Sequence, residues 1–328
     1  MSVRRGPNRR AILRGVAGGA ALLGLAPWLG ARRTQADAPL YQRIWGADQA
    51  SRGVPALLPG QRGDPAVGFV KVDERGAGPD HRLFVEVVIP EAKRPSYDRC
   101  KRLFDNYRLD QTKRESTTPE EAREILELLD AITDSPPMEV AREQVERMLG
   151  RALTRDEWQS VLFEIWFRAF DDGRNLDLSG FEHVVIGEQK AGAVSGHHFW
   201  YKYYLEDWGL LPIGGDAIDW DGTRYDGPPG REGRLATDGR RVPEVVTLAY
   251  RWRAHDDEAG VSRDLFQRIG GFFVGCSVEG LLALGLVRFF ARGRVETVIN
   301  GGRYQIDLHR SPDRQSLRSC FPRLLGRA

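Results

Sequence analysis

Three histidines, His183, His197 and His198, fall within sixteen positions of one another in a chain that has only six. Imidazole titrates near neutral pH, so two imidazoles that face one site can supply acid–base catalysis, one taking a proton while the other gives one. Metal binding by the three side chains is the competing chemistry, but no close Asp or Cys completes a ligand set, and the metal ligands stay unknown. Each histidine alone also fits an ordinary role, as a hydrogen-bonded core residue or a solvent-exposed one.

These histidines need elements that position them. The apolar run at residues 181–186 predicts a short strand, with His183 inside it. His197 and His198 follow Ser195-Gly196, and this pattern predicts a helix that begins there with Ser195 as its cap. The positive end of a helix dipole lowers an imidazole pKa and would hold a neutral base ready.

The rest of the chain predicts an α+β fold. Thr118 and Thr154 each open a capping box before apolar residues at helical spacing, so residues 95–170 are expected to be largely helical. Later segments alternate as strands, an apolar helix is expected over residues 278–290, and Asn300-Gly301 suits a type I′ hairpin turn. We therefore predict a mainly helical part over residues 39–170 and an α+β catalytic part over residues 171–328.

Paired arginines, Arg9-Arg10, precede an uncharged run rich in Ala, Gly and Leu at residues 15–31. This pattern predicts a twin-arginine export signal over residues 1–38, cleaved after Ala36 or Ala38. An uncleaved membrane anchor is the alternative, although the run is short and rich in glycine for a span of about 20 residues. We expect an exported protein, periplasmic or secreted, that touches a membrane only through an uncleaved signal.

Composition narrows the function classes. With 41% hydrophobic and 29% charged residues, the chain is globular, and neither disorder nor a polytopic membrane protein fits. Residues 1–38 hold seven of the 48 basic residues and one of the 46 acidic ones, so the remainder carries a net charge of −4. Nucleic acid would therefore need a local basic cleft. Three cysteines, Cys100, Cys276 and Cys320, allow one disulfide with one thiol, or three buried thiols.

At the histidines the sequence resembles the EndoU family, the XendoU-like endoribonucleases that prefer uridylates, as a divergent exported member of bacterial type. The resemblance spans about residues 41–310 in family order. It implies an α+β fold with N-terminal helices and two antiparallel β-sheets that form the catalytic cleft. The segments that carry it are residues 103–107 (LFDNY), 117–121 (TTPEE), 129–132 (LDAI), 162–168 (LFEIWFR), 179–188 (SGFEHVVIGE), 195–200 (SGHHFW) and 271–279 (GFFVGCSVE).

The resemblance implies cleavage of single-stranded RNA by its own 2′-hydroxyl, which leaves 2′,3′-cyclic phosphate ends. One histidine acts as base on the 2′-hydroxyl, the other as acid on the leaving 5′-oxygen, and a lysine stabilises the charged phosphorane. Cleavage in the family is metal-stimulated or metal-independent, which makes Mn²⁺ the implied cofactor, with no organic cofactor. RNA is the implied partner and DNA is not expected; we expect a monomer.

By residue-to-residue matching, the resemblance assigns catalysis to His183 and His198, and supporting roles to Glu182 and Glu188. We also expect supporting roles for the neighbouring His197 and for Gln267 and His309. The family lysine falls on Gln267, so the implied cation becomes Arg268, next to it.

A family serine falls on Gly271, and a tyrosine in a Gly-Thr-Ala-Tyr-Pro context aligns near His309. We expect an endoribonuclease whose activity is reduced by loss of the lysine. The alternatives are a catalytically silent EndoU-fold protein that binds RNA or a protein, and a phosphodiesterase acting on another nucleotide with a 2′-hydroxyl.

Overall fold

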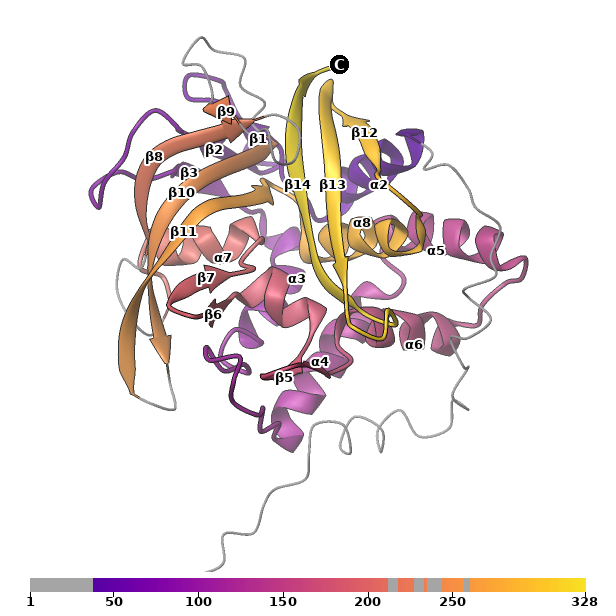
Figure 1. Cartoon of the computed structure of the whole chain (residues 1–328). Coiled ribbons are helices and arrows are strands. Elements are labelled where there is room, and N and C mark those ends of the chain that lie inside the picture. The colour runs from indigo at the N-terminus through magenta and orange to yellow at the C-terminus, as the bar shows by residue number, and fades with distance from the viewer. Residues whose placement is uncertain (1–37, 212–217, 227–232, 235–243, 257–259) are drawn as a thin grey trace, which may run out of the picture.

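The structure is a computed structural model of the chain, and it describes residues 38–211, 218–226, 233–234, 244–256 and 260–328 (Figure 1). The predicted export signal lies outside the described residues, apart from Ala38. The α+β class is confirmed, with helices gathered in the first half of the chain and the longer strands in the second.

The first half holds five helices among its described residues, and their caps explain where they begin. Thr118 and Thr154 each accept a hydrogen bond from the backbone N–H three residues on, and a glutamate there bonds back, so both predicted capping boxes are present. Two prolines start a further helix in the position where their missing N–H is tolerated. The helices are α2 (Ala38–Ser51), α3 (Arg94–Arg102), α4 (Pro119–Ile132), α5 (Pro136–Leu149) and α6 (Arg155–Trp166), with a 3₁₀ turn, η2 (Glu91–Lys93), before α3.

A small sheet of three strands also belongs to this half. It consists of β1 (Ala56–Leu57), β2 (Phe69–Val72) and β3 (Phe84–Val88) in that order. The β1–β2 pair is parallel and the β2–β3 pair is antiparallel. The mainly helical first half therefore includes a sheet that the sequence patterns did not indicate.

The second half is built around a six-stranded sheet in the order β6-β7-β11-β10-β8-β9. Its pairs are antiparallel except for the β7–β11 pair, which is parallel. The short hairpin β4 (Phe170–Asp172) and β5 (Asn175–Leu178) precedes it. The strands of the large sheet are β6 (Glu188–Lys190), β7 (Ala193–Ser195), β8 (Ile218–Asp226), β9 (Gly233–Arg234), β10 (Val245–Asp256) and β11 (Val261–Phe273), and α7 (Trp200–Asp207) lies between β7 and β8 in the chain.

A second antiparallel sheet ends the chain, after helix α8 (Val278–Phe290). It is formed by β12 (Glu296–Ile299), β13 (Gly302–Arg310) and β14 (Leu317–Arg327) in that order. Asn300 and Gly301 have φ of 48° and 78°, as the predicted type I′ turn requires. These two longer sheets match the expected pair, and Figure 1 shows β13 and β14 crossing in front of α8.

Helix α8 explains how the two halves form one core. Its residues are apolar almost throughout and buried along nearly the whole length. It contacts α2, α3, α5 and α6 as well as β13 and β14, so one continuous cluster of buried side chains joins the helices to the sheets. Among the described residues, no helix is both long and apolar enough to cross a membrane.

Two local predictions near the histidines were wrong. The run at residues 181–186 does not extend into a strand; it forms a π-helical turn, η3 (Glu182–Ile186). Ser195 does not cap a helix but ends β7, and α7 begins only at Trp200 with Phe199 at its N-cap. His197 and His198 therefore lie in the link between β7 and α7, before the first helical turn.

Candidate active site

Backbone hydrogen bonds join η3 to the β7–α7 link. The N–H of His197 donates to the carbonyl oxygen of His183 at 2.8 Å, and the N–H of His198 donates to that of Val184 at 2.6 Å. Gly196 makes this close approach possible, because a Cβ there would lie 2.0 Å from the carbonyl oxygen of His183, and its φ is +77°. Two segments more than ten residues apart are thus held at a fixed spacing.

This spacing brings His183 and His198 together as a pair. Their ring centroids are 6.0 Å apart, with ring planes inclined by 58°. Both residues are buried, with 8% and 6% of their surface exposed. The Nδ1 of His198 lies 2.8 Å from the carbonyl oxygen of Gly271 in β11. Since a carbonyl only accepts, the Nδ1 of His198 carries its hydrogen, and the Nε2 of the neutral ring keeps a lone pair.

The Nδ1 of His183 faces a carboxylate. It lies 3.3 Å from Glu188 Oε2, and Glu188, in β6, is fully buried. Glu188 is held by two other side chains: Arg318, in β14, donates two hydrogen bonds of 2.7 and 2.8 Å, and Gln111 donates one of 2.7 Å. Such a bidentate guanidinium–carboxylate pair fixes geometry as well as charge.

The pKa values of the site follow from burial and from these charges. Burial lowers the pKa of His183, and Arg318 lowers it further, whereas Glu188 opposes both. Burial, followed by the charge of His183, holds the pKa of His198 well below its usual value. Burial opposes ionisation of Glu188, but the charge of Arg318 and the contact with His183 outweigh it and lower its pKa to about 2. Glu188 is therefore ionised at neutral pH, and its charge favours the imidazolium form of His183 against burial and Arg318.

The second sheet closes the site from the other side. The ring of Phe321, in β14, stacks on the ring of His198, and His309, in β13, lies nearly parallel to Phe321 with 6.4 Å between centroids. A Cβ on Gly271 would lie 3.1 Å from the carbonyl oxygen of Pro322, so β11 and β14 approach closely here. The histidine pair thus lies between the two sheets, with His309 beside it.

His197 has a different position from the pair. Its ring is fully buried and stacks against Tyr203 and Trp252, with centroid distances of 3.9 and 4.6 Å. Its Nε2 lies 3.0 Å from Glu206 Oε2, and its Nδ1 lies 3.2 Å from the hydroxyl of Tyr250. These partners hold His197 in the core behind the site.

Glu182 also has structural partners. Its carboxylate accepts from the N–H of Ser179 at 3.2 Å, and its own N–H donates to the Ser179 hydroxyl at 3.2 Å. This reciprocal pair stabilises the start of η3 in the manner of a capping box. Glu182 therefore helps to place His183 in the chain.

Gln267 and Arg268 lie at an irregularity of β11. Tyr250 pairs with Gln267 and Leu248 pairs with Gly270, so β11 has one residue more than β10 in between. The Gln267 side chain is half-buried next to Gly270, whereas Arg268 is exposed and makes no hydrogen bond or ion pair with any described residue. In a regular strand, Gln267 and Arg268 would point to opposite faces of the sheet. The bulge breaks this alternation, so the strand pattern alone does not tell which of the two side chains faces the site.

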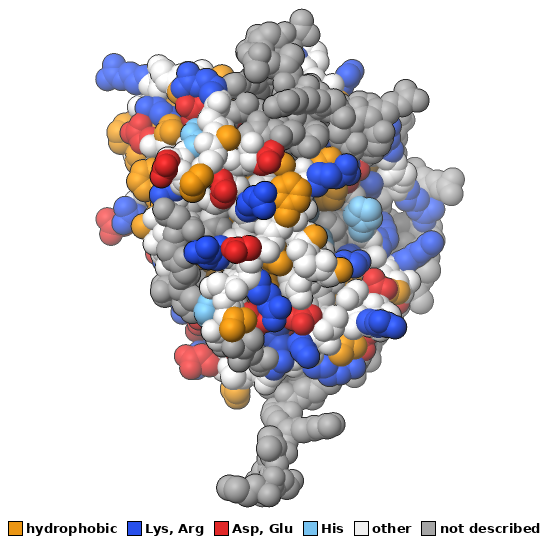
Figure 2. Space-filling view, turned by 60° about the vertical axis from the view of Figure 1, so that its left-hand side comes forward, with side chains coloured by type: hydrophobic (Ala, Val, Ile, Leu, Met, Phe, Trp, Pro, Cys, Tyr) orange, Lys and Arg blue, Asp and Glu red, His pale blue; other side chains and the backbone are white. Residues whose placement is uncertain are grey.

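Two further observations concern ligands. Within the described residues, no group of three or more His, Cys, Asp or Glu side chains is arranged to hold a metal ion, so these residues do not fit a resident manganese site and we derive no step through one. Figure 2 shows basic and acidic side chains interspersed on the face that it presents.

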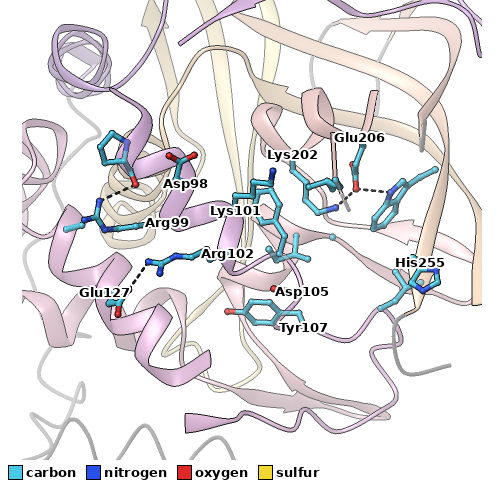
Figure 3. A pocket seen from close by; sticks show the side chains of 18 of the residues that line it. Asp98, Arg99, Lys101, Arg102, Asp105, Tyr107, Glu127, Lys202, Glu206 and His255 are labelled. Atoms are coloured by element: carbon cyan, nitrogen blue, oxygen red, sulfur yellow. Dashed lines mark hydrogen bonds and ion pairs between the residues drawn. The ribbon is translucent and has the colours of Figure 1, made fainter. Parts of the chain in front are cut away.

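A cavity of about 1070 Å³ lies elsewhere, beside α3, α4 and α7 (Figure 3). Lys202 and Glu206 form an ion pair at one end of it, where Trp252 donates to Glu206 at 3.1 Å. At the other end Arg102 pairs with Glu127. The histidine pair does not line this cavity; His197 lies behind Trp252 and Glu206.

An α+β fold that places two buried imidazoles between two sheets defines a class of protein suited to acid–base chemistry. Within that class the chain belongs to the XendoU family, because the family model described as endoribonuclease XendoU matches residues 41–322.

Curated relatives and a solved structure agree with this family. A poly(U)-specific endoribonuclease of Xenopus tropicalis is 26% identical over 88% of this chain and 92% of its own length. A uridylate-specific endoribonuclease C of Danio rerio is 28% identical over 88% of this chain and 87% of its own length. A solved structure of XendoU, described as a splicing-independent snoRNA-processing endoribonuclease, has a TM-score of 0.65 at 23% identity over 90% of this chain and 99% of its own, which shows a shared fold.

Sequence reasoning missed Arg318, Gln111 and Phe321. Gln111 and Arg318 lie far from His183 in the chain, and only the folded sheets bring them to Glu188. Phe321 had a usable signal: Phe321-Pro322 is an aromatic–proline pair at the end of the matched range, and it fits the tyrosine–proline motif better than the region near His309 does.

Proposed function

We propose that the chain is an exported endoribonuclease that cleaves single-stranded RNA by attack of the 2′-hydroxyl on the adjacent phosphate. The observation that carries the proposal is the histidine pair, with 6.0 Å between ring centroids and each Nδ1 occupied by its own acceptor. Both Nε2 atoms are then left for substrate, at a spacing suited to the two sides of one phosphate. The names of the relatives point to uridylates as the preferred nucleotides.

The surroundings of the two rings suggest their roles. His198 hydrogen-bonds to a neutral carbonyl and has the more strongly lowered pKa, so it suits the base that takes the 2′-hydroxyl proton. His183 faces the ionised Glu188, which stabilises an imidazolium, so it suits the acid that protonates the leaving 5′-oxygen. The 2′-oxygen–phosphorus bond forms as the bond to the 5′-oxygen breaks, which leaves a 2′,3′-cyclic phosphate and a 5′-hydroxyl.

Cleavage also concentrates negative charge on the non-bridging phosphate oxygens. Arg268 is proposed as the group that offsets this charge, because Gln267 has none and a guanidinium fits a phosphate. Stimulation by Mn²⁺ remains an expectation from the family resemblance. It is tested by assay with added Mn²⁺ and with chelator.

The decisive experiment incubates the mature protein with labelled oligo-RNA and identifies the ends. Cyclic phosphate ends are expected, and His183→Ala and His198→Ala should each slow cleavage by about 10²–10⁴. His255→Ala is the matched control, since His255 lies near the exposed end of β10 and contacts Ser262. Tight RNA binding without cleavage would favour the catalytically silent alternative. The replacement of the family lysine by Gln267 supports that alternative.

Export is a separate part of the proposal. Arg9-Arg10 ahead of the uncharged run supports a twin-arginine route. Replacing both arginines with lysine should leave the precursor in the cytoplasm, as followed by fractionation. Normal export of that double variant would exclude this route.

A further inference from the structure

We propose that Arg318 is a positioning residue of this site: its guanidinium grips Glu188 so that the carboxylate holds the His183 ring in one orientation and one tautomer. The inference deepens the proposed function, since it rests on His183 as the acid. Arg318 lies in β14, about 130 residues from Glu188 in the chain.

The geometry of Glu188 supports this role. Its Oε1 accepts from Arg318 at 2.8 Å, and its Oε2 accepts from Arg318 and from Gln111, both at 2.7 Å. The carboxylate therefore cannot turn without breaking several hydrogen bonds. His183 Nδ1 lies 3.3 Å from the same Oε2, so the fixed oxygen receives the Nδ1 hydrogen and directs Nε2 toward substrate.

The same contacts argue against direct binding of the scissile phosphate by Arg318. Both terminal nitrogens of its guanidinium are already engaged by Glu188, and its side chain is only 13% exposed. To bind phosphate with the same two-nitrogen fork, the guanidinium would have to release a fully buried carboxylate. Leaving such a charge unpaired is strongly unfavourable.

Arg318 also affects the charge balance around His183. The titratable groups that act on this ring are Glu188 in β6, Arg318 in β14, His309 in β13 and His198 in the β7–α7 link. Of these, Glu188 favours the imidazolium and Arg318 disfavours it. Without Arg318, the buried Glu188–His183 pair would hold its shared proton to higher pH, whichever of the two carries it.

The test compares Arg318→Gln, which removes the charge, with Arg318→Lys, which keeps a charge but has no bidentate fork. Arg168→Gln is the matched control: Arg168 also pairs near β14, with Ser316 and Asp313, and contacts neither Glu188 nor the histidine pair. The His183 ring is titrated by NMR, and kcat is measured against pH. Arg318→Gln should raise the His183 pKa by about one unit and reduce kcat at least tenfold, Arg318→Lys should fall between, and the control should match wild type.

An unchanged His183 titration with an unchanged kcat would overturn the proposal. A lower kcat with an unchanged titration would also overturn it, because Arg318 would then act on the phosphate itself. If Arg318→Gln fails to fold, as judged by circular dichroism, the Arg318→Lys titration decides. If the wild type cleaves no RNA, the proposed function fails, yet the NMR titration still tests the positioning role.

Discussion

The ring of Phe321 stacks on the ring of His198, with 4.7 Å between centroids and 26° between planes. The other restraint on this imidazole is the 2.8 Å contact from its Nδ1 to the carbonyl oxygen of Gly271. The two contacts come from different sheets, Phe321 from β14 and Gly271 from β11. The orientation of His198 therefore depends on how the two sheets pack.

Phe321→Ala should lower kcat by about tenfold, because an aromatic stack of this kind contributes about 0.5–1.5 kcal/mol beyond its buried area. Phe321→Tyr keeps the ring and should stay near wild type. The measurement is kcat on a uridine-containing oligonucleotide, with the melting temperature recorded for both variants. Equal kcat for the alanine and tyrosine variants would show that the stack does not orient His198.

Gly196→Ala should damage both the fold and the activity. The added Cβ would lie 2.0 Å from the carbonyl oxygen of His183, and the residue would keep a left-handed φ of +77°. Backbone strain alone is about 1–3 kcal/mol, and relief of the clash would move η3 away from His198. Both the free energy of unfolding and kcat should fall.

The Gly192→Ala variant distinguishes the effect of backbone strain from the effect of the steric clash at Gly196. Gly192 has a φ of +81°, close to that of Gly196, but a Cβ there meets nothing within 4 Å. This variant should lose only the strain contribution in urea unfolding and should retain kcat. If both alanine variants behaved alike, the contact between Gly196 and His183 would not matter for the site.

Sequence patterns predicted those parts of the fold whose conformation depends on neighbouring residues. The capping boxes at Thr118 and Thr154 and the turn at Asn300-Gly301 depend on neighbouring residues alone, and all three are present. Residues 184–186 are β-branched and favour a strand by propensity. They form η3 instead, because hydrogen bonds from His197 and His198 hold that segment from a distance.

The site was predictable only in part, for a related reason. Spacing and resemblance singled out His183 and His198, and the structure brings these two together. Residue types alone did not distinguish His197 from His198, and only the resemblance did, because the left-handed φ of +66° at His197 that turns its ring into the core is not visible in the residue types. Arg318 and Phe321 required the register of β14, which depends on tertiary packing.

Arg268 and Gln267 give a prediction about the missing lysine. If Arg268 supplies the cation, Arg268→Ala should lower kcat by about 10²–10³, the usual effect of losing such a stabilising group. Gln267→Lys should change kcat only modestly. Both are measured on the same RNA at two salt concentrations.

The opposite pattern would identify a weakened nuclease. If Gln267→Lys raised a near-zero rate by a hundredfold while Arg268→Ala had no effect, the exposed Arg268 would be a surface residue. The half-buried position of Gln267 would then be the place where the family cation belongs. The binding-protein alternative would gain support from that result.

Asp48 gives a prediction about stability and pH. It is fully buried in α2 and accepts a hydrogen bond of 3.1 Å from the N–H of Ser277, the N-cap of α8. Burial raises its pKa from 3.8 to about 7, against the hydrogen bonds from Ser277, and the nearby Glu279 raises it further. The protonated carboxyl is thus the form that the folded protein prefers.

The sign of the effect follows from this raised pKa. Between about pH 4 and pH 7 the unfolded chain loses the Asp48 proton while the folded protein retains it, so wild-type stability falls by up to about 1.4 kcal/mol per pH unit from this group. Asp48→Asn matches the shape of the protonated form and does not titrate. Its stability relative to wild type should therefore rise across this range and level off above pH 7.

Urea unfolding at pH 4.5, 6 and 7.5, with reductant for the three free cysteines, measures this difference. Asp73→Asn is the control of opposite sign, because a hydrogen bond from Arg75 outweighs partial burial and lowers the pKa of Asp73 to about 2. Relative to wild type, that variant should lose a little stability only between about pH 2 and 4, so across the measured range its difference from wild type should stay constant. If Asp48→Asn were less stable than wild type by the same amount at every pH, Asp48 would be ionised in the folded protein and the link between α2 and α8 would depend on a charged carboxylate.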